Sequence, residues 1–199
     1  MKKYAPDAIL SLGDRDYYFK SLLLQFIPHE INILQVGAIE DNRRAWRHFS
    51  GWSDIFFASY ISIFGGRIDV VDFNKEHLDN SKKVLDDFDI EYELHLSEAG
   101  EYISNTKRNY DIVYLDGSND PNETKAQYDN LNKKPVSVIL IDDYHIKGTE
   151  MKEGPDCKIQ EIPLFEGKSS MGIITNPRIY QDWFSEKDLN RINSIRDEI

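Results

Sequence analysis

INILQVGAIEDNRRAWRHFSGWSDIFFASYISIFGGRIDVVD, the sequence from Ile31 to Asp72, contains the elements that decide the fold. The short apolar run Ile33–Val36 stops at Gly37, which is typical of a strand buried on both faces of a parallel sheet. A second strand is predicted over Arg67–Val71, and Asp72 follows at its carboxyl end. We therefore expect two strands whose carboxyl ends carry a glycine and an acid.

A helix is predicted between these two strands. The segment Ile55–Phe64 is strongly apolar, Ser53 can serve as its N-cap, and Gly65 and Gly66 can end it. A strand, a crossover helix and a second strand make a βαβ unit, in which the strands run parallel.

Gly37 and Asp72 together point to an adenosine-type cofactor. In a doubly wound sheet, a glycine after the first strand allows a ligand to approach the backbone, and an acid after the second can accept both ribose hydroxyls. The alternatives are a plain tight turn at Gly37 and, for Asp72, an acid that caps the next turn.

The composition is that of an ordinary water-soluble domain. The chain has 199 residues, 40% of them hydrophobic, and a formal net charge of −11. This charge disfavours binding to nucleic acid or to an anionic membrane. Cys157 is the single cysteine, and no apolar core of a signal peptide follows Met1, so we expect a cytoplasmic protein. One domain over 1–199 is predicted, with a helical cap (1–30), a core (31–176) and a terminal helix (177–199).

Strands and helices alternate along most of the remaining chain. Helices are predicted over Asp16–Ile27 and Lys75–Phe88, around Ala99–Ile103, from Pro121 onward and over Ser185–Ile195; strands are predicted over Ile90–Leu96, Tyr110–Leu115 and Val136–Ile141. Lys158–Pro163 and Met171–Thr175 leave no room for a helix between them, so they should pair antiparallel. The predicted fold is α/β and Rossmann-like: a doubly wound, mostly parallel seven-stranded sheet with an antiparallel C-terminal hairpin and helices on both faces.

Four motifs resemble those of class I S-adenosylmethionine-dependent methyltransferases over residues 31–176. Leu34–Gly37 resembles the glycine motif, Val70–Asp72 the ribose-binding acid, and Asp111–Gly117 the fourth motif. Val138–Asp143 resembles the fifth strand of the small-molecule O-methyltransferase branch. The family usually has an acid where this chain has Gln35.

The resemblance implies a set of cofactor-binding residues. They are Gln35, Gly37, Ala38, Gly51, Ser53, Asp72, Phe73, Ser97, Glu98 and Asp116. A basic group, Arg43, Arg44, Arg47 and His48, either neutralises a carboxylate or phosphate at this site or forms a solvated turn.

Three aspartates at strand ends offer a candidate metal site. Asp116, Asp142 and Asp143 supply hard oxygen ligands that suit Mg²⁺. His145 matches the position of the proposed base in some sugar O-methyltransferases, and Asp116 and His145 are the predicted catalytic residues. The alternative is that Asp142 and Asp143 cap loops, Asp116 faces the cofactor amine, and His145 is an ordinary loop histidine.

The resemblance implies methyl transfer from S-adenosylmethionine to a hydroxyl of a small molecule, such as a sugar or nucleotide-sugar, with Mg²⁺ as a candidate second cofactor. Oxygen is favoured over nitrogen and carbon as the acceptor atom. The alternative is a catalytically degenerate protein that binds a nucleotide-like ligand without turnover. A nicotinamide-dependent oxidoreductase is disfavoured because the chain lacks G-x-G-x-x-G and ends its sheet with a hairpin. No nucleic acid or membrane partner is expected, and the sequence indicates no particular oligomeric state.

Overall fold

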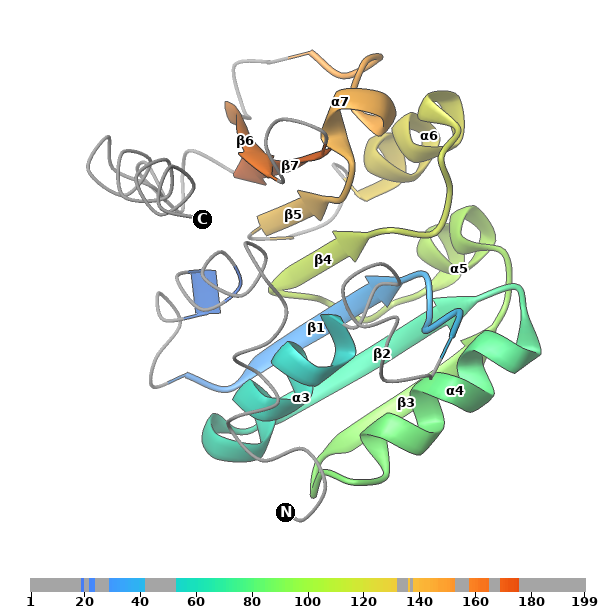
Figure 1. The fold of residues 1–199 in the computed structure, drawn as a ribbon, viewed down its shortest axis with the longest axis vertical. Coiled ribbons are helices and arrows are strands. Elements are labelled where there is room, and N and C mark those ends of the chain that lie inside the picture. The colour runs from blue at the N-terminus through green and yellow to red at the C-terminus, as the bar shows by residue number, and fades with distance from the viewer. Residues whose placement is uncertain are drawn as a thin grey trace.

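Seven strands form one sheet in the computed structural model, in the order β3-β2-β1-β4-β5-β7-β6 (Figure 1). The structure describes residues 19, 22, 23, 29–41, 53–131, 136, 138–152, 158–164 and 169–175. The strands are β1 (Ile31–Val36), β2 (Gly66–Asp72), β3 (Glu91–Leu96), β4 (Ile112–Leu115), β5 (Val138–Ile141), β6 (Lys158–Leu164) and β7 (Ser169–Thr175).

The topology is the predicted doubly wound one. The strands from β3 to β5 pair parallel, β7 pairs antiparallel with β5, and β6 pairs antiparallel with β7. Because β1 lies between β2 and β4, the chain order reverses at its carboxyl end. Ligands of open α/β sheets bind at such a reversal point.

Helices cover both faces of the sheet and divide the core in two. They are α3 (Ser53–Phe64), α4 (Lys75–Leu85), α5 (Ala99–Asn105), α6 (Pro121–Leu131) and the single turn α7 (Tyr144–Lys147). Ile33 and Leu140 face the cluster that contains α3 and α4, whereas Leu34 and Ile141 face the cluster that contains α5 and α6. Both faces of β1 and β5 are thus buried, as continuous apolar runs predict.

Local sequence signals account for the element ends. Gly65 donates its N–H to the Ile61 carbonyl at 2.8 Å and has a φ of +88°. A Cβ on Gly66 would lie 2.0 Å from the Ile31 carbonyl oxygen, so only glycine fits beside β1. Asn74 caps α4, as its Oδ1 accepts the N–H of Glu76 at 2.9 Å.

Several predictions differ from the structure in detail or fall outside it. The strand predicted from Ile33 begins at Ile31, and α3 already includes Ser53, the residue predicted to cap it. The short helix α7 was not predicted. Of the N-terminal helix, Phe19, Leu22 and Leu23 are described, and they are helical and buried. Gly51, the basic group 43–48 and the terminal helix lie outside the described residues. Within the described part of the chain, no helix has the length and apolar character needed to cross a membrane.

Candidate functional site

A small, open pocket lies at the carboxyl ends of the parallel strands, where the chain order reverses. Its lining comes from the ends of β1 and β2, the residues after β3 and β4, and one face of α6. The lining residues are Val36, Gly37, Val71, Asp72, Phe73, Ser97, Glu98, Ala99, Gly117, Glu123 and Gln127. Five of the predicted cofactor-binding residues, Gly37, Asp72, Phe73, Ser97 and Glu98, therefore meet at one pocket.

Asp72 joins the two turns that border this pocket. Its Oδ2 accepts the N–H of Ala38 at 2.8 Å, and its Oδ1 accepts the N–H of Asn74 at 2.7 Å. His77 Nδ1 lies 3.3 Å from Oδ2. Each carboxylate oxygen has two lone pairs, so this fixed side chain keeps the capacity to accept a further hydroxyl.

Only a glycine fits at position 37, because the backbone there has a positive φ and packs closely against the residues after β4. Its φ is +93°, and a Cβ there would lie 2.7 Å from the Asp116 carbonyl oxygen. Its N–H donates to Val71 O at 2.9 Å. The close packing of the turn against the ends of β2 and β4 thus accounts for the glycine.

Two pocket residues come from α6, which sequence reasoning did not connect with the site. Gln127 is buried and Glu123 is exposed, and they lie one helical turn apart. The helix begins at Pro121, as predicted, and the Asn122 N–H donates to Asp120 Oδ1 at 2.9 Å just before it. Such local signals mark where a helix starts but not what its face contacts. Phe73, another lining residue, is 64% exposed, so an aromatic side chain borders the pocket.

Gln35 lies beneath the turn and contacts an acid that sequence reasoning also missed. Its Nε2 donates to the Gly37 carbonyl at 2.9 Å and to Asp54 Oδ1 on α3. Burial raises the pKa of Asp54 to about 6, although hydrogen bonds from Ser81 and Gln35 lower it; the charge of Asp116 adds to the rise.

Asp116 is paired with a buried lysine from α7. Lys147 is 2% exposed, and its Nζ lies 2.9 Å from Asp116 Oδ1. Burial would lower the pKa of Lys147, but the charge and hydrogen bond of Asp116, with the charges of Asp142 and Asp143, hold it above its ordinary value. One of the three predicted metal ligands, Asp116, therefore pairs with an ammonium group, and the charges of the other two act on the same group.

This arrangement does not offer Mg²⁺ a ready site. The ammonium of Lys147 already occupies the Asp116 carboxylate. In the described part of the chain, Asp69, Glu93 and His95 are the only such group of donors that converge within 4.8 Å. The Mg²⁺ assignment to Asp116, Asp142 and Asp143 stays a prediction, and we derive no chemical step from it.

The segment after β5 is held tightly. Asp143 has a φ of +47° and its carbonyl accepts the N–H groups of Ile146 and Lys147 at 2.8 and 3.0 Å. The Tyr144 ring fills the space beside Gly172, where a Cβ would lie 2.1 Å from it. These contacts fix α7 and direct Lys147 inward.

His145 is exposed beside the same turn. Its backbone N–H donates to Ser170 Oγ at 2.8 Å, and its Nδ1 lies 3.4 Å from that oxygen. When Nδ1 carries the ring proton and donates it to Ser170 Oγ, Nε2 is the nitrogen that can accept a proton.

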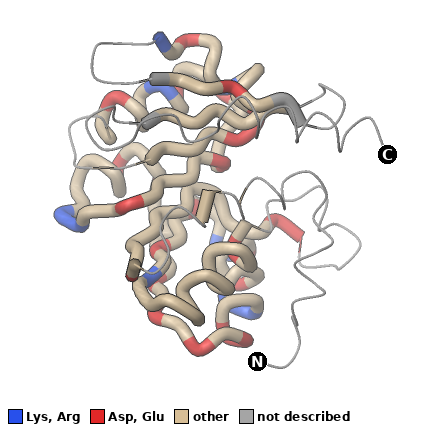
Figure 2. The backbone as a smooth tube through the Cα atoms, turned by 90° about the vertical axis from the view of Figure 1, so that its left-hand side faces the viewer, with Lys and Arg blue, Asp and Glu red and all other residues tan. Residues whose placement is uncertain are grey.

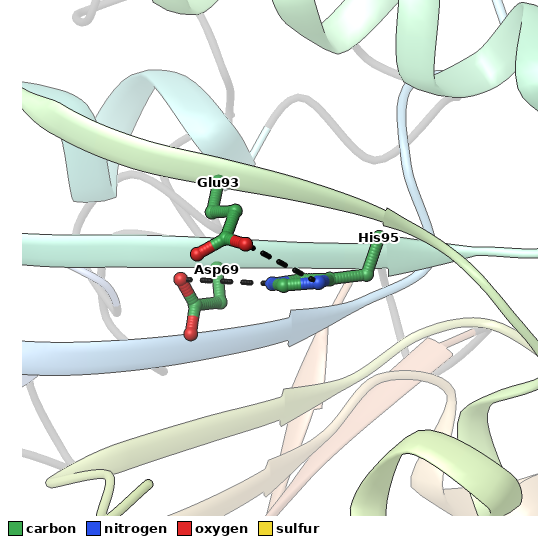
Figure 3. A group of neighbouring side chains, drawn as sticks. All are labelled: Asp69, Glu93 and His95. Atoms are coloured by element: carbon green, nitrogen blue, oxygen red, sulfur yellow. Dashed lines mark ion pairs between the residues drawn. The ribbon is translucent and has the colours of Figure 1, made fainter.

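A second polar cluster lies away from the pocket, on β2 and β3 (Figure 3). Asp69 Oδ1 and Glu93 Oε1 lie 3.8 and 4.0 Å from nitrogens of His95. Asp69 also accepts hydrogen bonds of 2.7 to 2.8 Å from Arg67, Arg108 and Tyr110. The guanidinium groups of Arg67 and Arg108 therefore balance the negative charges of the Asp69 and Glu93 carboxylates.

The fold is shared with solved methyltransferase structures. The O-methyltransferase TomG from Streptomyces achromogenes, in complex with SAM, is 16% identical, with a TM-score of 0.59 over 79% of this chain and 78% of that one. The O-methyltransferase from Bacillus cereus, in complex with SAH, is 18% identical, with a TM-score of 0.55 over 79% and 80%. An rRNA methylase from Streptococcus thermophilus is 12% identical, with a TM-score of 0.60 over 82% and 96%.

No protein-family model matches the chain, and no curated protein matches it. The structural likeness establishes the fold: this chain has the Rossmann-like fold of class I S-adenosylmethionine-dependent methyltransferases, as the resemblance of its motifs implied.

Proposed function

We propose that this protein is an S-adenosylmethionine-dependent methyltransferase that acts on a hydroxyl of a small molecule. The observation that carries the proposal is the pocket at the reversal point, with Gly37, Asp72 and Ser97 on its walls. Two solved proteins of the same fold are in complex with SAM and SAH. A sugar or nucleotide-sugar is the substrate class we propose.

In the proposed reaction, the protein positions two groups and removes one proton. The bond between the methyl carbon and the sulfonium sulfur breaks, and its electron pair stays on sulfur. The methyl carbon bonds to the acceptor oxygen, whose proton passes to His145. Alignment of this in-line displacement is the main contribution we assign to the protein.

The charge distribution supports a small molecule rather than RNA as the acceptor. Acidic residues are spread along the described backbone, with basic residues scattered between them (Figure 2). The net charge of −11 opposes association with a phosphate backbone. Because one protein of the same fold is an rRNA methylase, RNA belongs among the acceptors to be assayed.

Thermal unfolding with S-adenosylhomocysteine and with NAD tests the cofactor. A ligand at a hundred times its dissociation constant stabilises by about 2.7 kcal/mol, which raises Tm by several degrees. We expect a rise with S-adenosylhomocysteine and none with NAD. Asp72→Asn should remove the rise, whereas the exposed control Asp79→Asn should keep it.

An unchanged Tm with S-adenosylhomocysteine would refute the proposal. Binding without methyl transfer to any hydroxyl acceptor would instead favour the catalytically degenerate protein. A methyl-transfer assay with tritiated cofactor, run on sugars, nucleotide-sugars and RNA, separates these outcomes.

A further inference from the structure

The Asp72 carboxylate at the pocket accepts three hydrogen bonds from the protein itself. The N–H of Asn74 donates to Oδ1 at 2.7 Å, and the N–H of Ala38 donates to Oδ2 at 2.8 Å. The third contact comes from α4, where His77 Nδ1 lies 3.3 Å from Oδ2. The first two donors are backbone groups, so His77 is the side chain through which the sequence determines how this carboxylate is occupied.

The orientation of the Asn74 amide shows what His77 does at this contact. Asn74 Oδ1 accepts the N–H of Glu76 at 2.9 Å, so the amide nitrogen Nδ2 is turned toward His77 Nε2, 3.0 Å away. An amide nitrogen can only donate, and His77 Nε2 therefore accepts. A neutral imidazole that accepts at Nε2 carries its proton at Nδ1. His77 is thus a donor to Asp72 Oδ2.

The three donors leave Asp72 one position at which a ligand can donate. A carboxylate has about four lone-pair positions, two on each oxygen. Ala38 and His77 fill both positions of Oδ2, whereas Asn74 fills one position of Oδ1. No fourth donor contacts this carboxylate in the described part of the chain. Because Asp72 lines the pocket, the remaining position of Oδ1 is the one that a ligand can use.

We propose that His77 restricts Asp72 to a single hydroxyl of the cofactor ribose, which donates to Oδ1. An acid with both oxygens free could accept both ribose hydroxyls. Here Ala38 and the imidazole occupy Oδ2, so the second hydroxyl finds no acceptor on Asp72. His77 is thereby a specificity-determining residue, because it decides how many ribose hydroxyls the pocket recognises. This inference rests on the proposed function, since it concerns the same cofactor.

A pair of deoxy ligands tests how many hydroxyls Asp72 accepts. The 2′-deoxy and 3′-deoxy analogues of S-adenosylhomocysteine each lack one ribose hydroxyl, and isothermal titration calorimetry would compare their affinities with that of the parent ligand. We expect one analogue to bind the wild-type protein roughly 10- to 100-fold more weakly than the parent, because it lacks a hydrogen bond to a charged group. The other analogue should bind within about twofold of the parent. The decisive quantity is the ratio of the affinities of the two analogues.

Two substitutions of His77 test whether the imidazole sets this ratio. His77→Leu removes the donor and frees a lone pair of Oδ2, so both hydroxyls should contribute and the two analogues should bind within about twofold of each other. His77→Asn places an amide nitrogen at the position of Nδ1 and should keep the ratio of the wild-type protein. A general loss of structure would weaken all three ligands alike and leave the ratio unchanged. His29→Leu, at an exposed histidine that does not line the pocket, is the control and should alter none of the affinities.

The tautomer of His77 is a second measurement, and it requires no ligand. Long-range ¹H–¹⁵N NMR of the neutral imidazole should show a proton on Nδ1 and none on Nε2, with the His77 signals identified by their absence in His77→Asn. A proton on Nε2 would overturn the inference, because Nδ1 would then have none to donate to Asp72.

The outcomes separate this inference from the proposed function. If S-adenosylhomocysteine binds but the wild-type protein loses affinity equally for both deoxy analogues, or for neither, the inference is overturned and the cofactor assignment stands. A wild-type ratio that persists in His77→Leu would overturn it as well. If S-adenosylhomocysteine does not bind the wild-type protein, the proposed function fails and this inference fails with it.

Discussion

Asp54 and Asp69 are both fully buried aspartates, yet their surroundings differ in the donors they supply. Burial would raise the pKa of Asp69, but hydrogen bonds from Tyr110, Arg108 and Arg67 hold it below its ordinary value. For Asp54 the effect of burial prevails, and its pKa rises to about 6. The comparison shows that burial alone does not determine the pKa of a carboxyl group. A fully satisfied acid stabilises the fold, whereas Asp54, whose Oδ2 has no hydrogen-bond partner among the described residues, lowers the stability once it is ionised.

The largest expected effect comes from removing the satisfied acid. Asp69→Ala leaves the guanidinium of Arg108 and the hydroxyl of Tyr110 without their buried acceptor, so we expect a loss of about 3–5 kcal/mol in the free energy of unfolding. Urea unfolding at pH 7 measures it. The control is Glu91→Ala, whose side chain is 67% exposed and should cost less than about 1 kcal/mol. Equal costs for the two variants would contradict a structural role for the Asp69 cluster.

Asp54→Asn should have an effect of the opposite sign that depends on pH. Below about pH 4 Asp54 is protonated in both folded and unfolded states; above about pH 6 it is ionised in both. Because the raised pKa belongs to the folded state, its ionisation lowers stability as pH rises between these values, by on the order of 3 kcal/mol. The variant should therefore gain stability over the wild-type protein up to pH 8. Urea unfolding at about pH 4.5, 6 and 8 measures the difference in the free energy of unfolding between the variant and the wild-type protein. A difference that is the same at all three pH values would refute this prediction.

Lys147→Met extends the comparison to a buried cation, the ammonium group of Lys147. The change leaves Asp116, whose side chain is 18% exposed, without its cation, and we expect a loss of about 2 kcal/mol in the free energy of unfolding. The Tm of the wild-type protein should not respond to Mg²⁺ while Lys147 holds Asp116. The matched control is Lys125→Met, which breaks a surface pair with Asp129 and should cost less than about 0.5 kcal/mol. A clear Mg²⁺ response of the wild-type protein would instead support the metal site predicted from the sequence.

The smallest effect should come from Tyr110→Phe, which removes one donor from Asp69 and leaves the two arginines. We expect a loss of about 1 kcal/mol, the usual contribution of one hydrogen bond. The pKa of Asp69 should rise toward its ordinary value, because the Tyr110 hydroxyl lowers this pKa more than any other group does. Unchanged titration of Asp69 in carboxyl NMR would show that the arginines alone hold its charge.

Local signals in the sequence were sufficient to predict most of the fold. The apolar runs of β1 and β5, the two glycines after α3 and the missing crossover between β6 and β7 each depend on neighbouring residues. The pocket residues Gly37, Asp72 and Ser97 were predicted because strand ends converge in any parallel sheet.

The partners of the buried acids Asp54 and Asp116 could not be predicted from local sequence signals. Gln35 and Asp54 lie 19 positions apart, and Asp116 and Lys147 lie 31 apart. Their contacts follow from how α3 and α7 pack, which no periodicity encodes. Asp54 resembles an ordinary acid in the first turn of a helix, and Lys147 lies in a one-turn helix too short to leave a pattern.

Carboxyl-carbon NMR titration of the folded protein tests the contrast between the two acids most directly. The account predicts one aspartate that titrates near pH 6 and whose signal disappears in Asp54→Asn, whereas the pKa of Asp69 lies below the ordinary value of an aspartate. An Asp54 signal that titrates at or below the pH at which Asp69 titrates would contradict the account.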